Sequence, residues 1–203
     1  MEISELLSLE NTIAGELFAG LSYPWQALEL IKDFILKLGE ELPAEKFYKR
    51  GDDIWIARSA IVYPTAFIAG PCIIDENAEV RHGAFIRGSA IVGKNAVVGN
   101  SAELKNVVLF DGVQVPHYNY VGDSILGYKA HMGAGSITSN VKGDKTHVCV
   151  CIDGQNIDTG RKKFGAVLGD RAEIGCNSVL NPGTIIGRDA MVYPLSSVRG
   201  TVP

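Results

Sequence analysis

The 203-residue chain has little of several features that would identify a class of protein at once. Its cysteines are too few and too scattered for a disulfide framework, at Cys72, Cys149, Cys151 and Cys176. Its 19 basic and 23 acidic residues give a net charge of −4, so no basic field favours nucleic acid as a partner. No apolar run approaches the roughly 20 residues of a membrane span. We therefore expect neither a nucleic-acid nor a membrane partner.

The beginning of the chain also lacks the basic charge of a secretory signal. Residues 1–5 read MEISE, which is acidic where a signal peptide is basic. We therefore expect a cytoplasmic protein. Its length allows one large domain, or one domain with an appendage.

What the chain does have is a period of six. Aliphatic residues recur without a miss at Ile56, Val62, Ile68, Ile74, Val80, Ile86, Val92, Val98 and Leu104, and again at Leu168, Ile174, Leu180, Ile186, Val192 and Val198. A fixed short period is typical of a repeat architecture. We interpret each hexad as a short strand and a turn, with three hexads forming one triangular coil. This predicts an all-β solenoid over residues 54–203, a left-handed parallel β-helix of hexapeptide repeats, which is an exception to the usual right-handed crossover.

Residues 1–50 follow helical spacing instead. Pro24 suits the first turn of a helix, and Gly39 suits its stop. The apolar residues between them are Trp25, Leu28, Ile31, Phe34, Ile35 and Leu38. A shorter amphipathic stretch lies near residues 13–18. We expect an N-terminal α-helical cap over an open end of the solenoid, with a dimerisation or partner surface as the alternative.

The period fails in the middle of the chain, where a functional site is expected. Around His117 and Tyr120 the sequence is two residues short of the period of six. We interpret the hexads that begin at Pro116 and Val121 as each one residue short. Residues 141–165 then leave the coil. We expect an extruded loop there, a hairpin with a basic rim that suits an anionic ligand, although a purely solvated loop has the same composition.

Three strings carry a resemblance to a known family. PHYNYVGD (116–123) and GAGSITSN (133–140) resemble the H-x-x-Y-x-G-D and G-A-G-T-I-T-x-N strings of the acetyltransferase domain of N-acetylglucosamine-1-phosphate uridyltransferase/glucosamine-1-phosphate acetyltransferase. GRKKFGAVLGD (160–170) is similar to archaeal sugar-1-phosphate nucleotidyltransferases with a fused acetyltransferase domain. The resemblance covers about residues 54–203 and, more weakly, the helix at 23–25. The nucleotidyltransferase string G-x-G-T-R-M is absent, so we expect the acetyltransferase half without that domain.

The resemblance implies an acetyl-CoA-dependent N-acetyltransferase acting on an amino sugar phosphate such as glucosamine-1-phosphate or galactosamine-1-phosphate. His117 matches the general base, and Asn140 matches the asparagine that helps to seat the sugar amine and the acetyl group. Arg87 and Lys105 match cations that hold the sugar phosphate, and Tyr120 matches a tyrosine that contacts the substrate. For coenzyme A the matching residues are Ala134, Lys163 and Cys176, the last standing where the family often has serine.

The spacing adds a geometric expectation. Arg87 and Lys105 are one full coil apart, so they should stack on one face as a phosphate clamp. Lys105 and His117 are two hexads apart, which places them on different faces of one prism. A site that uses both therefore requires a cleft against a neighbouring subunit. We expect a homotrimer, because the flat faces of the prism must pack against another surface. In such a site, an imidazole near its reference pKa of about 6.5 can act as a base at neutrality, and Asn140 and the backbone of 133–135 are candidate donors to the thioester oxygen.

Two other functions fit parts of the pattern. A catalytically silent trimeric β-helix could bind a sugar phosphate or serve as a scaffold. A γ-type carbonic anhydrase shares the solenoid and binds a metal through three histidines; His82 and His117 would fit, but no third histidine follows His117 within a few residues. We therefore expect no metal site. Cys149 and Cys151 are expected to be plain thiols, because a zinc site needs two more ligands nearby.

Overall fold

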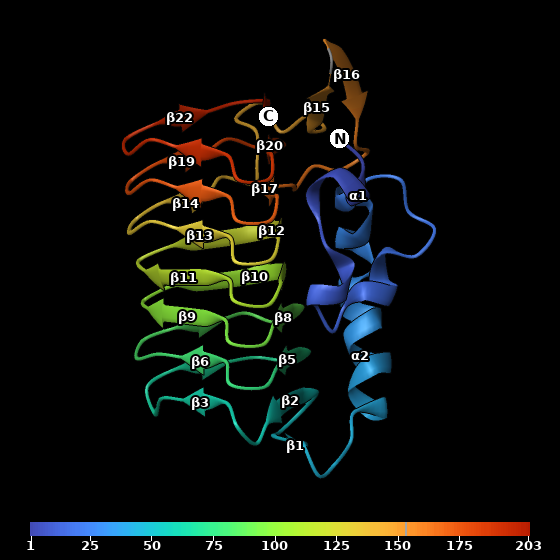
Figure 1. Ribbon diagram of the computed structural model, residues 1–203, viewed down its shortest axis with the longest axis vertical. Coiled ribbons are helices and arrows are strands. Elements are labelled where there is room, and N and C mark those ends of the chain that lie inside the picture. Colours follow the sequence, from blue (N-terminus) through green and yellow to red (C-terminus); the bar gives the residue numbers. More distant parts are fainter. Residues whose placement is uncertain (153) are drawn as a thin grey trace.

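Three flat faces of short parallel strands wind around a single core in a computed structural model that describes residues 1–152 and 154–203 (Figure 1). Face A stacks β2 (Ile54–Ala57), β5 (Cys72–Ile74), β8 (Ala90–Val92), the second part of β10 (Glu103–Leu109), the second part of β12 (Tyr120–Leu126), β17 (Ala166–Leu168), β20 (Thr184–Ile186) and β23 (Thr201–Val202). Face B stacks β3 (Ile61–Val62), β6 (Glu79–Val80), β9 (Val97–Asn100), β11 (Gln114–His117), β13 (His131–Met132), β18 (Glu173–Ile174) and β21 (Met191–Val192). Face C stacks β4 (Phe67–Ile68), β7 (Phe85–Ile86), the first parts of β10 and β12, β14 (Ile137–Thr138), β19 (Val179–Leu180) and β22 (Ser197–Val198). The left-handed parallel β-helix expected from the period of six is confirmed.

The core is built from one inward side chain per strand. The periodic aliphatic residues stack on their equivalents in the coils above and below, as Ile56 does on Ile74 and Ile74 on Val92. All three are fully buried. Each buried apolar side chain stabilises the fold by about 25 cal/mol per Å² of surface removed from water, and this contribution recurs along every face. The hexad pattern is thus the pattern of the interior.

Face A differs from the other two faces because its outward side chains are apolar as well. They are Trp55, Ile73, Ile91, Val108, Ile125, Val167 and Ile185, and every one is buried. Helices of the N-terminal segment cover this row: α2 (Ile31–Glu41) packs on β5, β8 and β10, and η3 (Pro24–Glu29) packs on β12 (Figure 1). The segment also contains α1 (Ile3–Leu6), η1 (Leu9–Asn11) and η2 (Gly15–Phe18).

The helical segment therefore caps a side of the solenoid, not its end. The expectation of an end cap was wrong in this respect, because the apolar row on face A offers a larger surface to bury than an end does. At the first coil, β1 (Phe47–Lys49) pairs antiparallel with β2. At the last coil, β15 (Cys149–Ile152) contacts β23, and the Thr201 hydroxyl donates to the Cys151 carbonyl over 2.6 Å. The pairing of β1 and the contact of β15 cover the two terminal strands of face A, whose edges would otherwise be open.

Gly39 has a different role from the predicted stop. Helix α2 runs through it to Glu41, and the indole of Trp55 lies directly against its Cα. A side chain at position 39 would overlap that ring. The absent Cβ is what lets the helix approach face A closely.

The two positions missing from the period lie elsewhere than the sequence suggested. Between Ile56 and Val198, outside the loop at 141–165, successive inward side chains are six residues apart except from Leu104 to Leu109 and from Val121 to Leu126. One short hexad therefore does begin at Val121, but the other begins at Leu104 and not at Pro116. The sequence misleads here because Phe110 and Pro116 lie six and twelve residues after Leu104 and so fit the period, although the inward residues are Leu109 and Val115. Both shortened turns lie on the edge where face C meets face A, which we call the C–A edge.

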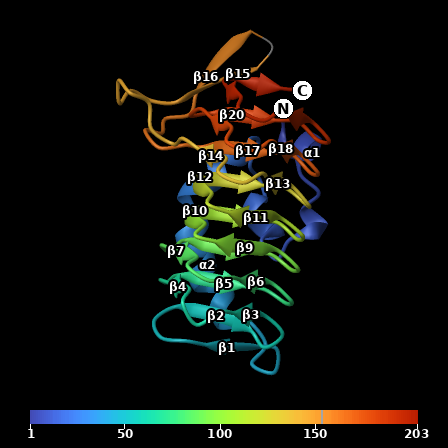
Figure 2. The same ribbon diagram turned by 90° about the vertical axis from the view of Figure 1, so that its left-hand side faces the viewer.

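The segment between β14 and β17 leaves the coil at the same edge, one coil later (Figure 2). It contains an antiparallel hairpin of β15 and β16 (Gln155–Asp158). Val141 and Lys163 form a bridge at its base. Three successive turns of the C–A edge are therefore irregular, whereas the other two edges keep their period.

Replacement of Gly39 by alanine should destabilise the fold, because the new methyl group meets the Trp55 ring. Overpacking of this kind costs about 1–3 kcal/mol. Chemical denaturation measures the loss. Gly143→Ala is the matched control, since no atom lies within 4 Å of the position that its Cβ would take. Equal stability of the two variants would contradict the close approach of α2 to face A.

A buried carboxylate lies on the edge between faces A and B. Asp75 is 1% exposed and accepts a hydrogen bond at Oδ1 from the Glu76 amide over 2.7 Å. Its Oδ2 has no hydrogen-bond partner among the described residues. Burial raises the pKa of Asp75 to about 6, and the nearby charge of Asp111 adds to this, while the Glu76 amide and Lys94 oppose it.

This raised pKa predicts a pH dependence of stability. Between about pH 4 and pH 6 the folded state holds more protons than the unfolded state, so the free energy of unfolding contributed by Asp75 falls as the pH rises. Asp75→Asn should therefore raise stability at pH 7, by at most about 3 kcal/mol, and should flatten the difference curve across pH 4–6. Urea melts of both proteins at several pH values test this. A variant less stable than the parent at pH 7 would contradict it.

Candidate functional site

The C–A edge holds a buried carboxylate, Asp123, that accepts hydrogen bonds from three side chains. Lys105 Nζ donates to its Oδ1 and Oδ2 over 2.9 and 3.1 Å. Asn106 Nδ2 donates to Oδ1 over 3.0 Å, and Asn140 Nδ2 donates to Oδ2 over 2.6 Å. Asp123 is 2% exposed, so desolvation makes these contacts obligatory. The carboxylate therefore fixes three side chains of the edge.

Asn106 and Asp123 occupy the two shortened turns themselves. Both have left-handed backbone conformations, with φ of 55° and 47°. Asn and Asp tolerate this conformation better than other residues with a side chain. The shortened turns thus bring both polar groups to the same place on the edge.

Tyr120 and Arg87 extend the cluster onto face C. Asn140 Nδ2 also donates to the Tyr120 hydroxyl over 3.1 Å. Burial, followed by the charge of Asp123, raises the pKa of Tyr120. Arg87 is in register with Lys105 in the adjacent coil, and its guanidinium contacts Glu103 Oε1 over 2.8 Å. The sequence-predicted residues Arg87, Lys105, Tyr120 and Asn140 therefore lie together.

The charges of this cluster alternate. Arg87 is paired with Glu103, and Lys105 is paired with Asp123. The two cations stack as their spacing predicted, but each has a carboxylate partner, so these four side chains together are close to neutral. Arg87 is the more open of the two, with 46% of its side chain exposed against 27% for Lys105.

Asn140 is oriented by its neighbours. A carboxylate can only accept, so the amide group of Asn140 must turn its Nδ2 to Asp123. Both contacts of that side chain, to Asp123 and to Tyr120, use Nδ2. Its Oδ1 is therefore the atom left for a ligand. This arrangement does not suit the predicted role of donor to a thioester oxygen, because the donor group is already occupied.

A second group of predicted residues lies on the edge between faces B and C, which we call the B–C edge. His117, Ala134 and Cys176 take equivalent positions in three successive coils, as the pairing of β11 with β13 and of β13 with β18 requires. Asn119 is 2% exposed and fixes this turn. Its Oδ1 accepts from the His117 amide over 2.9 Å, and its Nδ2 donates to the carbonyls of Gly133 and Ser136 over 2.8 and 3.0 Å.

The His117 side chain is exposed, and its ring makes no hydrogen bond to any residue that the structure describes. An imidazole in this state can accept a proton from a ligand. Next to Cys176 a mainly apolar hollow of about 420 Å³ is lined by His131, Ile174, Met191, Val192 and Tyr193, among others. The B–C edge therefore presents an exposed imidazole at His117 and, two coils further along, an apolar surface at Cys176.

Lys163 lies on the C–A edge and not with the other two predicted coenzyme A residues. It pairs with Val141 at the base of the loop, and the next amide, of Phe164, donates to the Asn140 carbonyl over 3.0 Å. With Arg161 and Lys162 it lines a hollow of about 490 Å³ that Gln26 and Glu29 close from the helical segment. This is a basic hollow beside the cluster around Asp123.

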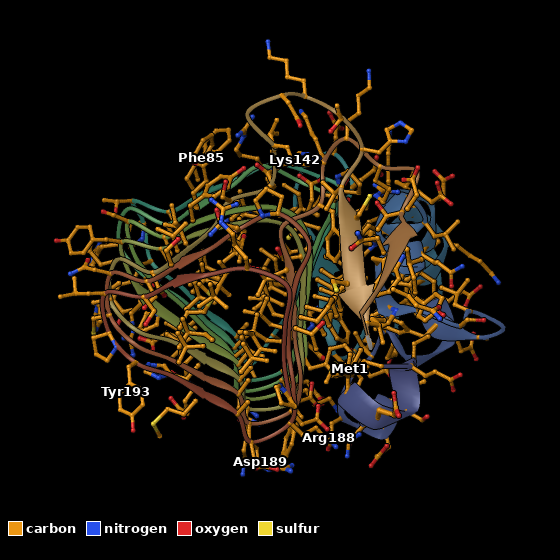
Figure 3. All side chains as sticks on the ribbon, turned by 90° about the horizontal axis from the view of Figure 1, so that it is seen from above. Met1, Phe85, Lys142, Arg188, Asp189 and Tyr193 are labelled. Carbon is orange, nitrogen blue, oxygen red and sulfur yellow. The ribbon has the colours of Figure 1, made fainter. Side chains whose placement is uncertain are left out.

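The two edges are separate corners of one prism. Figure 3 looks down the solenoid and shows Tyr193, which follows the face B strand β21, on one side of the prism and Lys142 of the loop on another. Because strands of face C lie between these corners, His117 and Asn140 face different directions within one chain. Asp123, Asn106 and Asn119 were missed as site residues. The shortened turns could have revealed the first two, but nothing in the sequence marked Asn119.

Residues 68–202 match the family described as GMPPB C-terminal domain. The chain belongs to this family. Two curated relatives add detail: a bifunctional sugar-1-phosphate nucleotidylyltransferase/acetyltransferase of Sulfurisphaera tokodaii is 37% identical over 102 residues, and a bifunctional protein GlmU of Methanococcus maripaludis is 36% identical over 92 residues. These alignments cover 50% and 45% of this member of the family but only 25% and 22% of the relatives. The resemblance inferred from the strings at 116–123 and 133–140 is confirmed.

Solved structures resemble the chain in fold. A hexapeptide transferase family protein from Anaplasma phagocytophilum has a TM-score of 0.40 and 21% identity, over 68% of this chain and 69% of that one. A mutant of perosamine N-acetyltransferase from Caulobacter crescentus, in complex with CoA and GDP-perosamine, has a TM-score of 0.39 and 18% identity, over 73% of this chain and 53% of that one.

None of the helices in 1–152 and 154–203 is long and apolar enough to cross a membrane. The same residues hold no cluster of three His, Cys, Asp or Glu side chains suited to a metal ion.

Proposed function

We propose that this chain is an acetyl-CoA-dependent N-acetyltransferase that acts on an amino sugar phosphate such as glucosamine-1-phosphate or galactosamine-1-phosphate. The supporting observation is that the sequence-predicted residues form two polar groups, one on each side of face C. The names of the relatives, a nucleotidylyltransferase/acetyltransferase and GlmU, favour this chemistry. The proposal includes a cytoplasmic location.

In this proposal the C–A edge binds the sugar phosphate. The exposed part of the Arg87 guanidinium contacts the phosphate, and the free Asn140 Oδ1 accepts a hydrogen bond from the sugar amine or a hydroxyl. Tyr120 contacts the sugar ring. Lys105 contributes its charge from a position that Asp123 fixes.

The B–C edge supplies the base and the acetyl donor. The coenzyme A arm lies along the column of Ala134 and Cys176, and Lys163 of a neighbouring subunit contacts its phosphates. The sugar ammonium loses one proton to solvent, the amine attacks the thioester carbonyl, His117 takes a second proton from the nitrogen as the C–N bond forms, and the C–S bond breaks. The proton then passes from His117 to the coenzyme A thiolate. No covalent enzyme intermediate is needed.

Since the two edges face apart within one chain, the complete site requires a second copy, and we propose a homotrimer. Exposed apolar side chains on face C fit such an interface. Phe67 and Phe85 are 60% and 41% exposed, and their ring centroids are 5.6 Å apart. Adjacent exposed aromatic rings favour an interaction surface at this place.

Removal of the His117 imidazole should lower kcat by about 10²–10⁴ with a smaller effect on KM, since a positioned base contributes that factor. Release of coenzyme A upon addition of glucosamine-1-phosphate or galactosamine-1-phosphate measures this in His117→Ala. His82→Ala is the matched control, because His82 lies two coils away on the same edge and bonds to Thr65 over 2.9 Å.

The same assay separates this function from its alternative. A catalytically silent trimeric β-helix that binds a sugar phosphate, or serves as a scaffold, would release no coenzyme A with either sugar. It would still bind the sugar phosphate or form the trimer. Pairing of both cations with carboxylates is the observation that favours this alternative.

Phe85→Glu should dissociate the proposed trimer, because it places a charge on the face C patch. Analytical ultracentrifugation should find the parent at three times the chain mass and the variant at one. Leu30→Glu is the matched control, since Leu30 is also 41% exposed but belongs to the helical segment. A parent that sediments as a monomer would overturn the trimer.

A further inference from the structure

The N-terminal helical segment contacts the proposed sugar-phosphate site from behind by two routes. The first route runs through Asn106, whose Nδ2 donates to the Leu28 carbonyl over 3.1 Å and to Asp123 Oδ1 over 3.0 Å. One amide group thus joins the end of η3 to the carboxylate that holds Lys105 and Asn140.

The second route runs from Trp25 through Phe164 to the backbone of Asn140. The ring of Trp25, in η3, lies 6.0 Å from the ring of Phe164 between centroids. Phe164 is fully buried, and its amide donates to the Asn140 carbonyl over 3.0 Å. Beside it, Arg161 of the loop lies 3.6 Å from Glu29. Asn140 is therefore fixed through its side chain by Asp123 and through its backbone by Phe164.

The carboxylate at the centre depends on all of its donors. Asp123 is buried and accepts from Lys105, Asn106 and Asn140 at once. Loss of the Asn106 donor leaves Asp123 Oδ1 with Lys105 alone, which favours rearrangement of the remaining donors. A displacement of η3 would therefore alter the positions of Lys105 and Asn140.

We propose that the helical segment is a positioning element of the sugar-phosphate site, with Asn106 and Trp25 as the positioning residues through which it acts. They touch neither substrate; they set where Lys105 Nζ and Asn140 Oδ1 lie. This role rests on the proposed function, because it specifies how that same site is held. It also gives the segment a task beyond covering face A.

The test uses two variants on the segment side of the network. Asn106→Gly keeps the left-handed backbone available and removes both hydrogen bonds. Trp25→Leu keeps an apolar side chain and removes the contact with Phe164. Each should raise KM for the amino sugar phosphate, Asn106→Gly by about tenfold, while KM for acetyl-CoA stays within about twofold.

Asp170→Asn is the matched control. Asp170 is also a fully buried carboxylate that holds the N-terminal segment, since its Oδ2 accepts from the Ser8 amide and hydroxyl over 3.0 and 2.6 Å. It lies on the edge between faces A and B, away from Lys105 and Asn140. This variant should lower the midpoint of chemical unfolding and leave both KM values unchanged.

The outcomes separate the two proposals. If the parent releases no coenzyme A with either sugar phosphate, the proposed function fails and the positioning role fails with it. If the parent is active but Asn106→Gly leaves the sugar KM unchanged, or if Asp170→Asn raises it equally, the positioning role alone is overturned. Selective weakening of sugar-phosphate binding in Asn106→Gly and Trp25→Leu supports it.

Discussion

Everything in this molecule depends on the requirement that each coil buries one side chain per face directly above its equivalent in the coil below. Ile56, Ile74 and Val92 show this stacking on face A. The requirement fixes the register of neighbouring coils, and the register in turn fixes the column in which His117, Ala134 and Cys176 stand. The register of the strands therefore makes neighbours of side chains that are far apart in the sequence. No strong contact between those side chains is needed.

The same stacking explains how opposite charges come to alternate. On the C–A edge, cation and carboxylate alternate from Arg87 and Glu103 to Lys105 and Asp123. A stack of unpaired cations would repel itself, whereas the alternating set is self-compensating. The buried pair at Asp123 fixes geometry because its desolvated oxygens need every donor available. The more exposed Arg87 contributes less to stability and is freer to respond to a ligand.

Sequence alone could predict the solenoid, because a period of six repeated fifteen times has no other economical explanation. It could also pair Arg87 with Lys105, because that inference needs only the length of a coil. It could not place the helical segment. The outward apolar residues recur at intervals of about one coil from Trp55 to Ile125 and again from Val167 to Ile185, but the stronger inward pattern concealed them. It misplaced one shortened turn, because Phe110 and Pro116 preserve the count while β10 has already lost a position. The partners of Asp123 could not be foreseen either, since they depend on side-chain directions at turns with positive φ.

The shortened turns show where residues can be deleted from or inserted into such a chain. A residue removed or a loop inserted at the C–A edge alters only the length of one corner, because the strands on both sides remain locked to their neighbours by backbone hydrogen bonds. Faces A, B and C keep their alignment across the loop: β12 pairs with β17, β13 with β18 and β14 with β19, although the whole inserted segment stands between the paired strands in the sequence. Each edge is thus an independent place for variation, and one edge can acquire new chemistry while the other two continue to hold the molecule together.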